Sequence, residues 1–192
     1  YGVPQNRKRI IIFGVRKEDF GERSEEIVNK FYNNYLPKYK VKKKKTVYEA
    51  IGDLPKLYPI AENIKINGMK TRHTLPNPPV ENHIARWQSD RDIGIFKLLT
   101  EDIESGKREY DSKKIAKLYE EKIGSSSPIH RYHVLEPDLP STTIIAHLYK
   151  DGNRFIHYDS KQARTITPRE AALLQSFDED FEFIGSRGNA YE

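Results

Sequence analysis

The residues with the clearest chemical potential are two arginines near the start of the chain. Arg7 and Arg9 follow Gln5 at alternating positions, with Lys8 between them. A guanidinium group keeps its charge at physiological pH, and its planar fork can hold a carboxylate, a phosphate or a base oxygen in a fixed geometry. From the pattern alone, the simpler interpretation is that these cations form a solvated entrance to a strand.

A second group of polar residues surrounds the start of a predicted helix. Thr167 is a natural N-cap, Pro168 occupies the first helical position, and Glu170 follows the cap by three residues, so the pattern predicts a capping box. Arg164 and Arg169 are expected near the entrance of this helix. Apolar residues then recur at helical spacing, namely Ala171, Leu173, Leu174 and Phe177. Capping alone would indicate nothing more than a core helix.

The elements that must position these residues are predicted as a mixture of helices and strands. The first arginines lead into residues 10–15, a continuous β-branched run that is typical of a strand buried on both faces. Apolar spacing predicts a helix over 24–35 that Pro37 ends. Further helices are expected at 47–52 after Thr46, at 93–103 with Asp90 or Asp92 near its start, and at 113–123 with Asp111 or Ser112 as cap.

The remaining segments are predicted from turn signals. Residues 55–83 are rich in proline and asparagine, so we expect an ordered loop or a partly mobile excursion. Strand-like runs at 142–149 and 154–158 flank an Asp-Gly pair, which predicts a β-hairpin. Its tip would carry Lys150 and Arg154, which could contact phosphate.

Composition limits the classes of protein that this chain can belong to. Its 192 residues could form one core, and 33 basic against 28 acidic residues give a net charge of +5, which permits an anionic partner without requiring one. No apolar stretch approaches the roughly 20 residues of a membrane span. The absence of cysteine excludes disulfides and thiolate zinc sites. His130 and His133 are spaced by three, but no carboxylate stands at ligand spacing, so no metal site is expected.

Two other features have two interpretations each. The lysine-rich run at 40–45 is either a flexible solvated segment or a phosphate contact. Trp87 stands alone between polar residues and is either a packing anchor or a wedge that stacks on a base.

Three motifs, in order along the chain, resemble one enzyme family. YGVPQNRKR at 1–9 is similar to the eighth conserved block of the DNA cytosine-5 methyltransferases, YGxPQxRxR. PSTTIIAH at 140–147 is similar to the PSxTIxAH element that ends the target-recognition region in some members. RTITPREAALLQSF at 164–177, with the aspartates and phenylalanine that follow, resembles the ninth block, RxLTxRExARLQxFPDxF, although the proline of that block is absent. The element T-V-x-x-A-I-x-D-L-P also matches at 46–55.

The resemblance implies a fold class and a domain division. We expect an α+β fragment, mixed α/β in content, that consists mainly of the small target-recognition domain with one strand from the edge of a Rossmann-like catalytic domain. Residues 1–20 would end the catalytic domain, 21–162 would form the target-recognition region, and 163–192 would lead back towards the catalytic domain.

The resemblance also implies an activity. The family transfers a methyl group from S-adenosylmethionine to C5 of a flipped cytosine in a specific sequence of double-stranded DNA. Such a protein is expected in the bacterial cytoplasm, associated with the nucleoid, and a restriction-modification system is a fitting setting. The family's Pro-Cys nucleophile and Glu-Asn-Val block have no match here. We therefore expect a missing N-terminal half to hold the cofactor and nucleophile, and this chain alone to be inactive; the alternative is a non-catalytic DNA-binding module or split subunit.

The family motifs assign roles to individual residues. Arg9 would contact the flipped cytosine and Arg7 would brace the catalytic glutamate of the missing half. Gln5 would be a hydrogen-bonding brace and is counted among the DNA-binding residues. Thr143 and Ile144 match the family's Thr-Leu pair at the DNA-facing end of the recognition region. The remaining expected residues are Lys150 and Arg154 as DNA contacts, Arg164, Thr167, Arg169 and Glu170 as structural groups, and no metal ligands.

Overall fold

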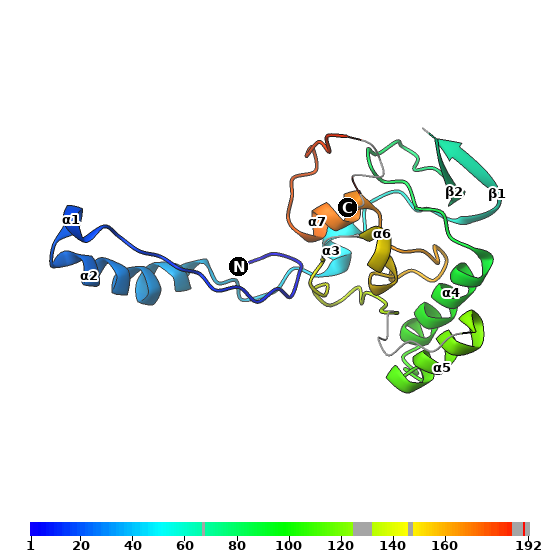
Figure 1. The fold of residues 1–192 in the computed structure, drawn as a ribbon, viewed down its shortest axis with the longest axis horizontal. Coiled ribbons are helices and arrows are strands. Elements are labelled where there is room, and N and C mark those ends of the chain that lie inside the picture. Colours follow the sequence, from blue (N-terminus) through cyan, green and yellow to red (C-terminus); the bar gives the residue numbers. More distant parts are fainter. Residues whose placement is uncertain (67, 125–131, 146–147, 186–189, 191–192) are drawn as a thin grey trace.

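The computed structural model describes residues 1–66, 68–124, 132–145, 148–185 and 190 of the chain. In Figure 1, an arm formed by most of the first 45 residues extends from a body that contains the rest of the described chain. The body combines helices with one two-stranded sheet. This mixture agrees with the expected α+β class at the level of secondary-structure content.

The arm folds back on itself around one tyrosine. It contains α1 (Lys17–Phe20), α2 (Arg23–Lys30), the π turn η1 (Phe31–Tyr35) and the 3₁₀ turn η2 (Leu36–Tyr39). The hydroxyl of Tyr32 accepts from the backbone N–H of Phe13 at 2.9 Å and donates to the carbonyl of Ile11 at 3.0 Å. The helix predicted over 24–35 is confirmed in α2 and η1, although helical structure continues through Pro37 in η2.

The predicted buried strand at 10–15 is wrong for the chain as it folds here. Residues 10–15 have no regular secondary structure, and Ile10 and Ile12 are 88% and 89% exposed. A strand buried on both faces needs hydrogen-bonded neighbours on each side and apolar cover above and below. In the arm, α2 and η1 lie beside this run (Figure 1) and offer it no strand to pair with. The backbone and most side chains of residues 10–15 therefore remain exposed to solvent.

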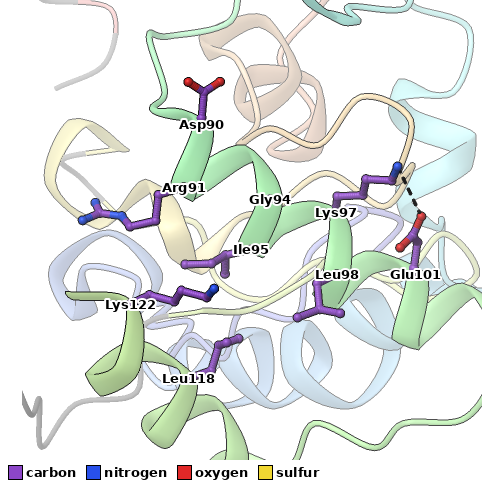
Figure 2. Close-up of a pocket in the computed structure, with 9 residues that line it drawn as sticks. All are labelled: Asp90, Arg91, Gly94, Ile95, Lys97, Leu98, Glu101, Leu118 and Lys122. Atoms are coloured by element: carbon purple, nitrogen blue, oxygen red, sulfur yellow. Dashed lines mark ion pairs between the residues drawn. The ribbon is translucent and has the colours of Figure 1, made fainter. Parts of the chain in front are cut away.

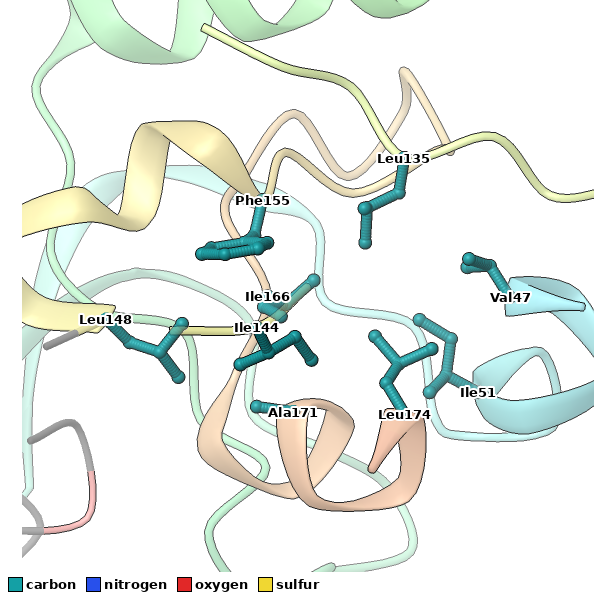
Figure 3. Packing of buried hydrophobic residues seen from close by; sticks show 9 residues of the cluster. All are labelled: Val47, Ile51, Leu135, Ile144, Leu148, Phe155, Ile166, Ala171 and Leu174. Carbon is teal, nitrogen blue, oxygen red and sulfur yellow. The ribbon is translucent and has the colours of Figure 1, made fainter. Parts of the chain in front are cut away.

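The body is built around two short capped helices that pack on each other. In α3 (Val47–Ile51), Thr46 and Glu49 form a capping box, and in α7 (Pro168–Leu174), Thr167 and Glu170 form another. Both helices begin where the sequence predicts. Figure 3 shows the core that they share with segments lying between them in the sequence, which consists of Val47, Ile51, Leu135, Ile144, Leu148, Phe155, Ile166, Ala171 and Leu174.

A second core lies between two longer helices and the chain that follows them. The predicted helices are confirmed as α4 (Asp90–Glu104) and α5 (Ser112–Ile123), capped by Ser89 and Asp111. Both aspartates expected near the start of this helix lie in the first turn of α4. The buried residues of this core are Ile95, Phe96, Leu99, Leu118, Tyr132, Val134, Ile156 and Ala163.

The segment predicted as a loop over 55–83 contains the described sheet. Strands β1 (Pro59–Ile66) and β2 (Met69–His73) pair antiparallel, with Ile64 opposite Thr71 and Ile66 opposite Met69. The loop prediction is therefore wrong for 59–73. Proline content dominated that prediction, whereas the alternation of half-buried and exposed residues near the turn is the pattern of a hairpin with one face on the body.

The hairpin predicted across 142–158 is also wrong. The Asp-Gly pair lies instead in two helical turns, α6 (Leu148–Asp151) and η3 (Gly152–Arg154). Ile156 pairs with other segments, because it donates to the His133 carbonyl and its own carbonyl accepts from Leu135, both at 2.9 Å. The preference of Asp-Gly for a hairpin turn is local. The backbone hydrogen bonds of Ile156 to distant segments and the burial of Leu148 in the core favour the helical turns instead.

Candidate nucleic-acid interface

The first and second of the three matched motifs meet in a hydrogen-bonded junction. The N–H of Asn6 donates to the Ser141 carbonyl at 2.8 Å, and the N–H of Ser141 donates to the Pro4 carbonyl at 2.9 Å. Gln5 and Ser141 thereby form an isolated parallel bridge. Because these backbone bonds fix register, the first motif is held beside the PSTTIIAH element across 137 residues of sequence.

Side chains strengthen this junction. The hydroxyl of Thr143 donates to the Asn6 carbonyl at 2.8 Å, and Nη1 of Arg7 donates to the Ile144 carbonyl at 3.3 Å. The Ile144 side chain is buried in the core (Figure 3), so it cannot itself meet a ligand. The structure thus brings together Arg7, Thr143 and Ile144, three of the expected site residues. Thr143 lies at the surface, and the buried side chain of Ile144 fixes this segment to the core.

Gln5 and Arg9 have contrasting environments. The side chain of Gln5 is buried, and neither atom of its amide group has a hydrogen-bond partner among the described residues. Arg9 is exposed and its guanidinium donates only to the carbonyl of Lys8, at 2.7 Å, among the hydrogen bonds of the described chain. Arg9 therefore presents its charge outside the junction, where another molecule or another part of a protein can reach it.

A groove of about 490 Å³ opens beside Thr143. Its lining residues come from three segments and are Tyr132, His133, Thr142, Thr143, Ile145, Arg154 and Phe155. Tyr132 is buried and its hydroxyl has no hydrogen-bond partner within the described residues. Burial raises the pKa of Tyr132 to about 12, so this group stays a protonated donor at neutral pH. Arg154 is the cation on the wall of this groove that can meet an anionic group.

Of the two basic residues expected to contact DNA, one lines this groove and the other does not. Arg154, at the end of η3, lines it, whereas Lys150 is exposed on α6 and is not among its lining residues. Of the PSTTIIAH element, Ala146 and His147 lie outside the described residues, as does His130 of the histidine pair. Sequence reasoning missed Tyr132 and His133 as groove residues, because no spacing signal connects them with Thr143 or Arg154.

A buried ion pair lies at the start of α7. Arg164 donates to both carboxylate oxygens of Glu170 at 2.7 Å, and Gln162 accepts from the same guanidinium at 2.8 and 3.2 Å. The N–H of Thr167 also donates to Glu170, at 2.7 Å. Burial raises the pKa of Glu170, but the charge and the hydrogen bonds of Arg164, together with the neighbouring histidines, hold that pKa well below its usual range.

Three buried histidines surround this pair. His157 lies with Nε2 3.5 Å from Glu170, His83 contacts the Thr167 hydroxyl at 3.0 Å, and His73 contacts the Gln162 carbonyl at 3.0 Å. Burial lowers the pKa of each imidazole, to about 4 for His73 and well below the usual value for His157. All three are therefore neutral at pH 7. Their wide spacing in sequence offered no signal that they would converge.

Arg169 connects α7 to two flanking loops. Its Nε donates to the Glu81 carbonyl at 3.0 Å and its Nη1 donates to the Glu179 carbonyl at 2.9 Å. The guanidinium carbon also lies 5.4 Å from the centre of the Phe183 ring, within the range of a cation–π contact. Its position at the helix entrance agrees with the expectation from sequence, and its contacts orient the helix against the chain around residue 81.

A separate groove between α4 and α5 contains none of the expected site residues. Figure 2 shows its lining, which combines Ile95, Leu98 and Leu118 with charged residues at the rim: Asp90, Arg91, Lys97, Glu101 and Lys122. Lys97 and Glu101 form an ion pair at 3.8 Å. In the described part of the chain, no three histidine or acidic side chains form a group that could hold a metal ion, and no helix has the length and apolarity to cross a membrane.

Comparison with known proteins assigns the family. The profile described as C-5 cytosine-specific DNA methylase matches residues 1–192. This chain belongs to the C-5 cytosine-specific DNA methylase family.

Several curated relatives are similar along nearly the whole chain. The Type II methyltransferase M.Bpa9945I of Bacillus paralicheniformis is 30% identical over 205 residues, which cover 100% of this chain and 44% of that protein. The Type II methyltransferases M.BbvI of Brevibacillus brevis and M.NgoFVII of Neisseria gonorrhoeae are 31% and 32% identical over 97% of this chain, and the matches cover 39% and 40% of their lengths. The chain thus spans less than half the length of these relatives. No solved structure matches it.

Proposed function

We propose that this chain is the DNA-recognising part of a DNA (cytosine-5) methyltransferase that transfers a methyl group from S-adenosylmethionine to C5 of a flipped cytosine. The observation that carries the proposal is the junction of Arg7 and Thr143 with Ile144 and Asn6. It joins the arginine motif to the recognition segment, so one rigid unit would contact both the extruded base and the duplex around it.

The exposed guanidinium of Arg9 is suited to the base. A cytosine must leave the stack before an enzyme can reach its C5 and C6, and its hydrogen-bonding edge must then be held. The guanidinium of Arg9 takes no part in the hydrogen bonds of the junction and can supply two donors to a base oxygen. Arg7, whose guanidinium already contacts the Ile144 carbonyl, would brace a catalytic carboxylate from elsewhere in the protein.

The surface beside the junction is suited to the duplex. The guanidinium of Arg154 offers donors on the wall of the groove, and phosphate oxygens accept such donors. Lys150 extends the positive charge on the exposed side of α6. We propose that this groove lies on the DNA-facing side.

The described residues do not form a Rossmann-like site for the cofactor. The two described strands form a hairpin with each other, and neither leads through a glycine-rich turn into a helix, the arrangement that cradles a nucleoside in Rossmann-like folds. The chain also contains no cysteine that could add to C6. We propose that S-adenosylmethionine and the nucleophile are held by another part of the full-length protein, and that this chain alone transfers no methyl group.

The setting that we propose is a bacterial restriction-modification system, because the similar proteins are named Type II methyltransferases. The DNA partner and a location in the cytoplasm beside the nucleoid follow from the same proposal. A second candidate is a non-catalytic DNA-binding subunit, which the lack of cysteine in these residues also fits.

The test is methyl transfer by the full-length protein, with this chain alone as the second sample. Unmethylated DNA and S-adenosylmethionine carrying a labelled methyl group are supplied, and the DNA is hydrolysed to locate the label. We expect label in 5-methylcytosine with the full-length protein and none with this chain. DNA binding without transfer by the full-length protein would favour the non-catalytic subunit, and label on adenine or on the N4 atom of cytosine would contradict the proposal.

A further inference from the structure

The β1–β2 hairpin stands out from the body on the side away from the arm (Figure 1). Its two faces differ. Ile64, Ile66 and Met69 are half-buried and Thr71 is buried, so this face lies on the body. The alternate positions near the turn are exposed, and they are Lys65 in β1 and Lys70 in β2.

These two lysines stand directly opposite each other. Lys65 pairs with Lys70 in the register of the hairpin, which places their Cβ atoms about 5 Å apart on the same face. Like charges in directly opposed positions destabilise a sheet. Neither ammonium group forms an ion pair with a carboxylate of the described chain. The hairpin therefore exposes concentrated positive charge that the described protein does not neutralise.

The base of the hairpin is held rigidly. Arg72 pairs with Asp90 at 2.7 Å and donates to the Ala61 carbonyl at 3.2 Å, which connects both strands to the start of α4. The indole N–H of Trp87 donates to the Asn63 side chain at 2.7 Å, so this half-exposed tryptophan serves as an anchor of the hairpin. The position of the lysine pair is thus set before any partner binds.

We propose that the Lys65–Lys70 face of the hairpin is a second DNA-binding surface, separate from the groove at Thr143, and that its two ammonium groups contact backbone phosphates of the duplex. This inference rests on the proposed function. Phosphates repeat densely along B-DNA, so two adjacent cations can each meet one and lose their mutual repulsion. A two-stranded ribbon is also one of the elements that fit beside or within the major groove.

The test measures DNA affinity of the full-length protein against salt concentration. Sheared genomic DNA is the probe, because phosphate contacts do not depend on sequence. In the double variant Lys65→Gln and Lys70→Gln, we expect the slope of log affinity against log salt to become shallower by roughly 2, and affinity at low salt to fall about tenfold. The double variant Lys65→Arg and Lys70→Arg should retain the wild-type slope.

A matched control removes the same charge elsewhere. Lys113 and Lys117 are exposed on one helix, α5, and their double change to glutamine should leave the slope unchanged. Thermal unfolding should show that the hairpin variant is as stable as the wild type or slightly more stable, because the repulsion is gone.

Three outcomes would overturn the inference in distinguishable ways. An unchanged slope in the hairpin variant would refute the surface while leaving the proposed function intact. Equal losses in the hairpin and α5 variants would show that net charge alone is responsible, which also refutes it. Failure of the wild-type protein to bind DNA at all would overturn both the inference and the proposed function.

Discussion

Arg164 and Glu170 face each other inside the protein through two parallel hydrogen bonds of 2.7 Å, and the side chain of each is 1% exposed. Glu170 simultaneously caps the first turn of α7 through Thr167. One carboxylate therefore closes the helix and neutralises the buried cation. The pair connects the strand-like segment before α7 to the helix itself.

Because this pair is buried, removing one charge should be costly. We expect Glu170→Gln to lower the free energy of unfolding by about 3–5 kcal/mol, since it leaves the Arg164 guanidinium without its counter-ion. Glu49→Gln is the matched control, because Glu49 makes the same cap on α3 at the surface, and this substitution should cost much less. Chemical denaturation of the full-length protein measures both, and equal losses would contradict the importance of burial.

The buried histidines predict loss of stability in mild acid. The unfolded chain binds a proton at each histidine near pH 6.5, whereas folded His73 does so only near pH 4. The unfolded state thus binds more protons between these values, and the free energy of unfolding should fall by about 3 kcal/mol for His73 as pH drops from 6.5 to 4. His83 and His157 act in the same direction, and Glu170 adds a loss below its unfolded pKa.

Denaturation of the full-length protein across that pH range is the measurement. His73→Asn should flatten the dependence, because one titrating group is gone. A wild-type stability that stays constant from pH 6.5 to 4 would show that these imidazoles are protonated in the folded protein.

At the start of α7, the N-cap residue Thr167 can be compared with Arg169, which contacts two neighbouring segments. Thr167→Ala should cost about 1 kcal/mol through the lost cap. Arg169→Ala should cost more and should also weaken DNA affinity, because Arg169 joins α7 to the carbonyls of Glu81 and Glu179. Thermal stability and DNA affinity of the full-length variants are measured together, with Thr46→Ala as the surface counterpart of the cap change. If Arg169→Ala altered neither property, α7 would be only a capped core helix.

Substitutions of Arg9 and Arg7 in the first motif should affect the rate of methyl transfer and the stability of the protein differently. Arg9→Ala in the full-length protein should slow the chemical step by about 10² or more, because an exposed guanidinium that holds the flipped base acts at the transition state. Duplex affinity, dominated by phosphate contacts, should stay within a few-fold. Single-turnover methyl transfer and equilibrium binding measure the two effects.

Arg7→Ala is the contrasting variant. It removes the hydrogen bond to Ile144 and should lower thermal stability as well as turnover. Equal losses of binding and turnover in the Arg9 variant would instead identify Arg9 as a phosphate-binding or structural residue.

Sequence specificity should reside between the two end motifs. Exchange of residues 58–158 for the matching segment of a relative with another target should move the methylation pattern with the segment, because base-edge contacts specify while backbone contacts position. Sequencing that detects 5-methylcytosine reads the outcome. A folded, active chimera that keeps the original target would refute this division of the chain.

The sequence by itself determined the elements whose signals are local. Both capping boxes, at Thr46 and Thr167, need residues within three positions of each other, and α4 and α5 follow from apolar spacing along one helix. The motifs that indicate the family are likewise contiguous, and the profile match confirms the family.

Only the tertiary structure decided where distant segments meet. The Asp-Gly pair at 151–152 became helical because Ile156 found backbone partners at His133 and Leu135, and the apolar run from Ile10 stayed open because no strand lies beside it in the described chain. The junction of Arg7 with Ile144 and the convergence of three histidines on one ion pair join residues far apart in sequence. Such contacts depend on the packing of the whole body, which no local spacing records.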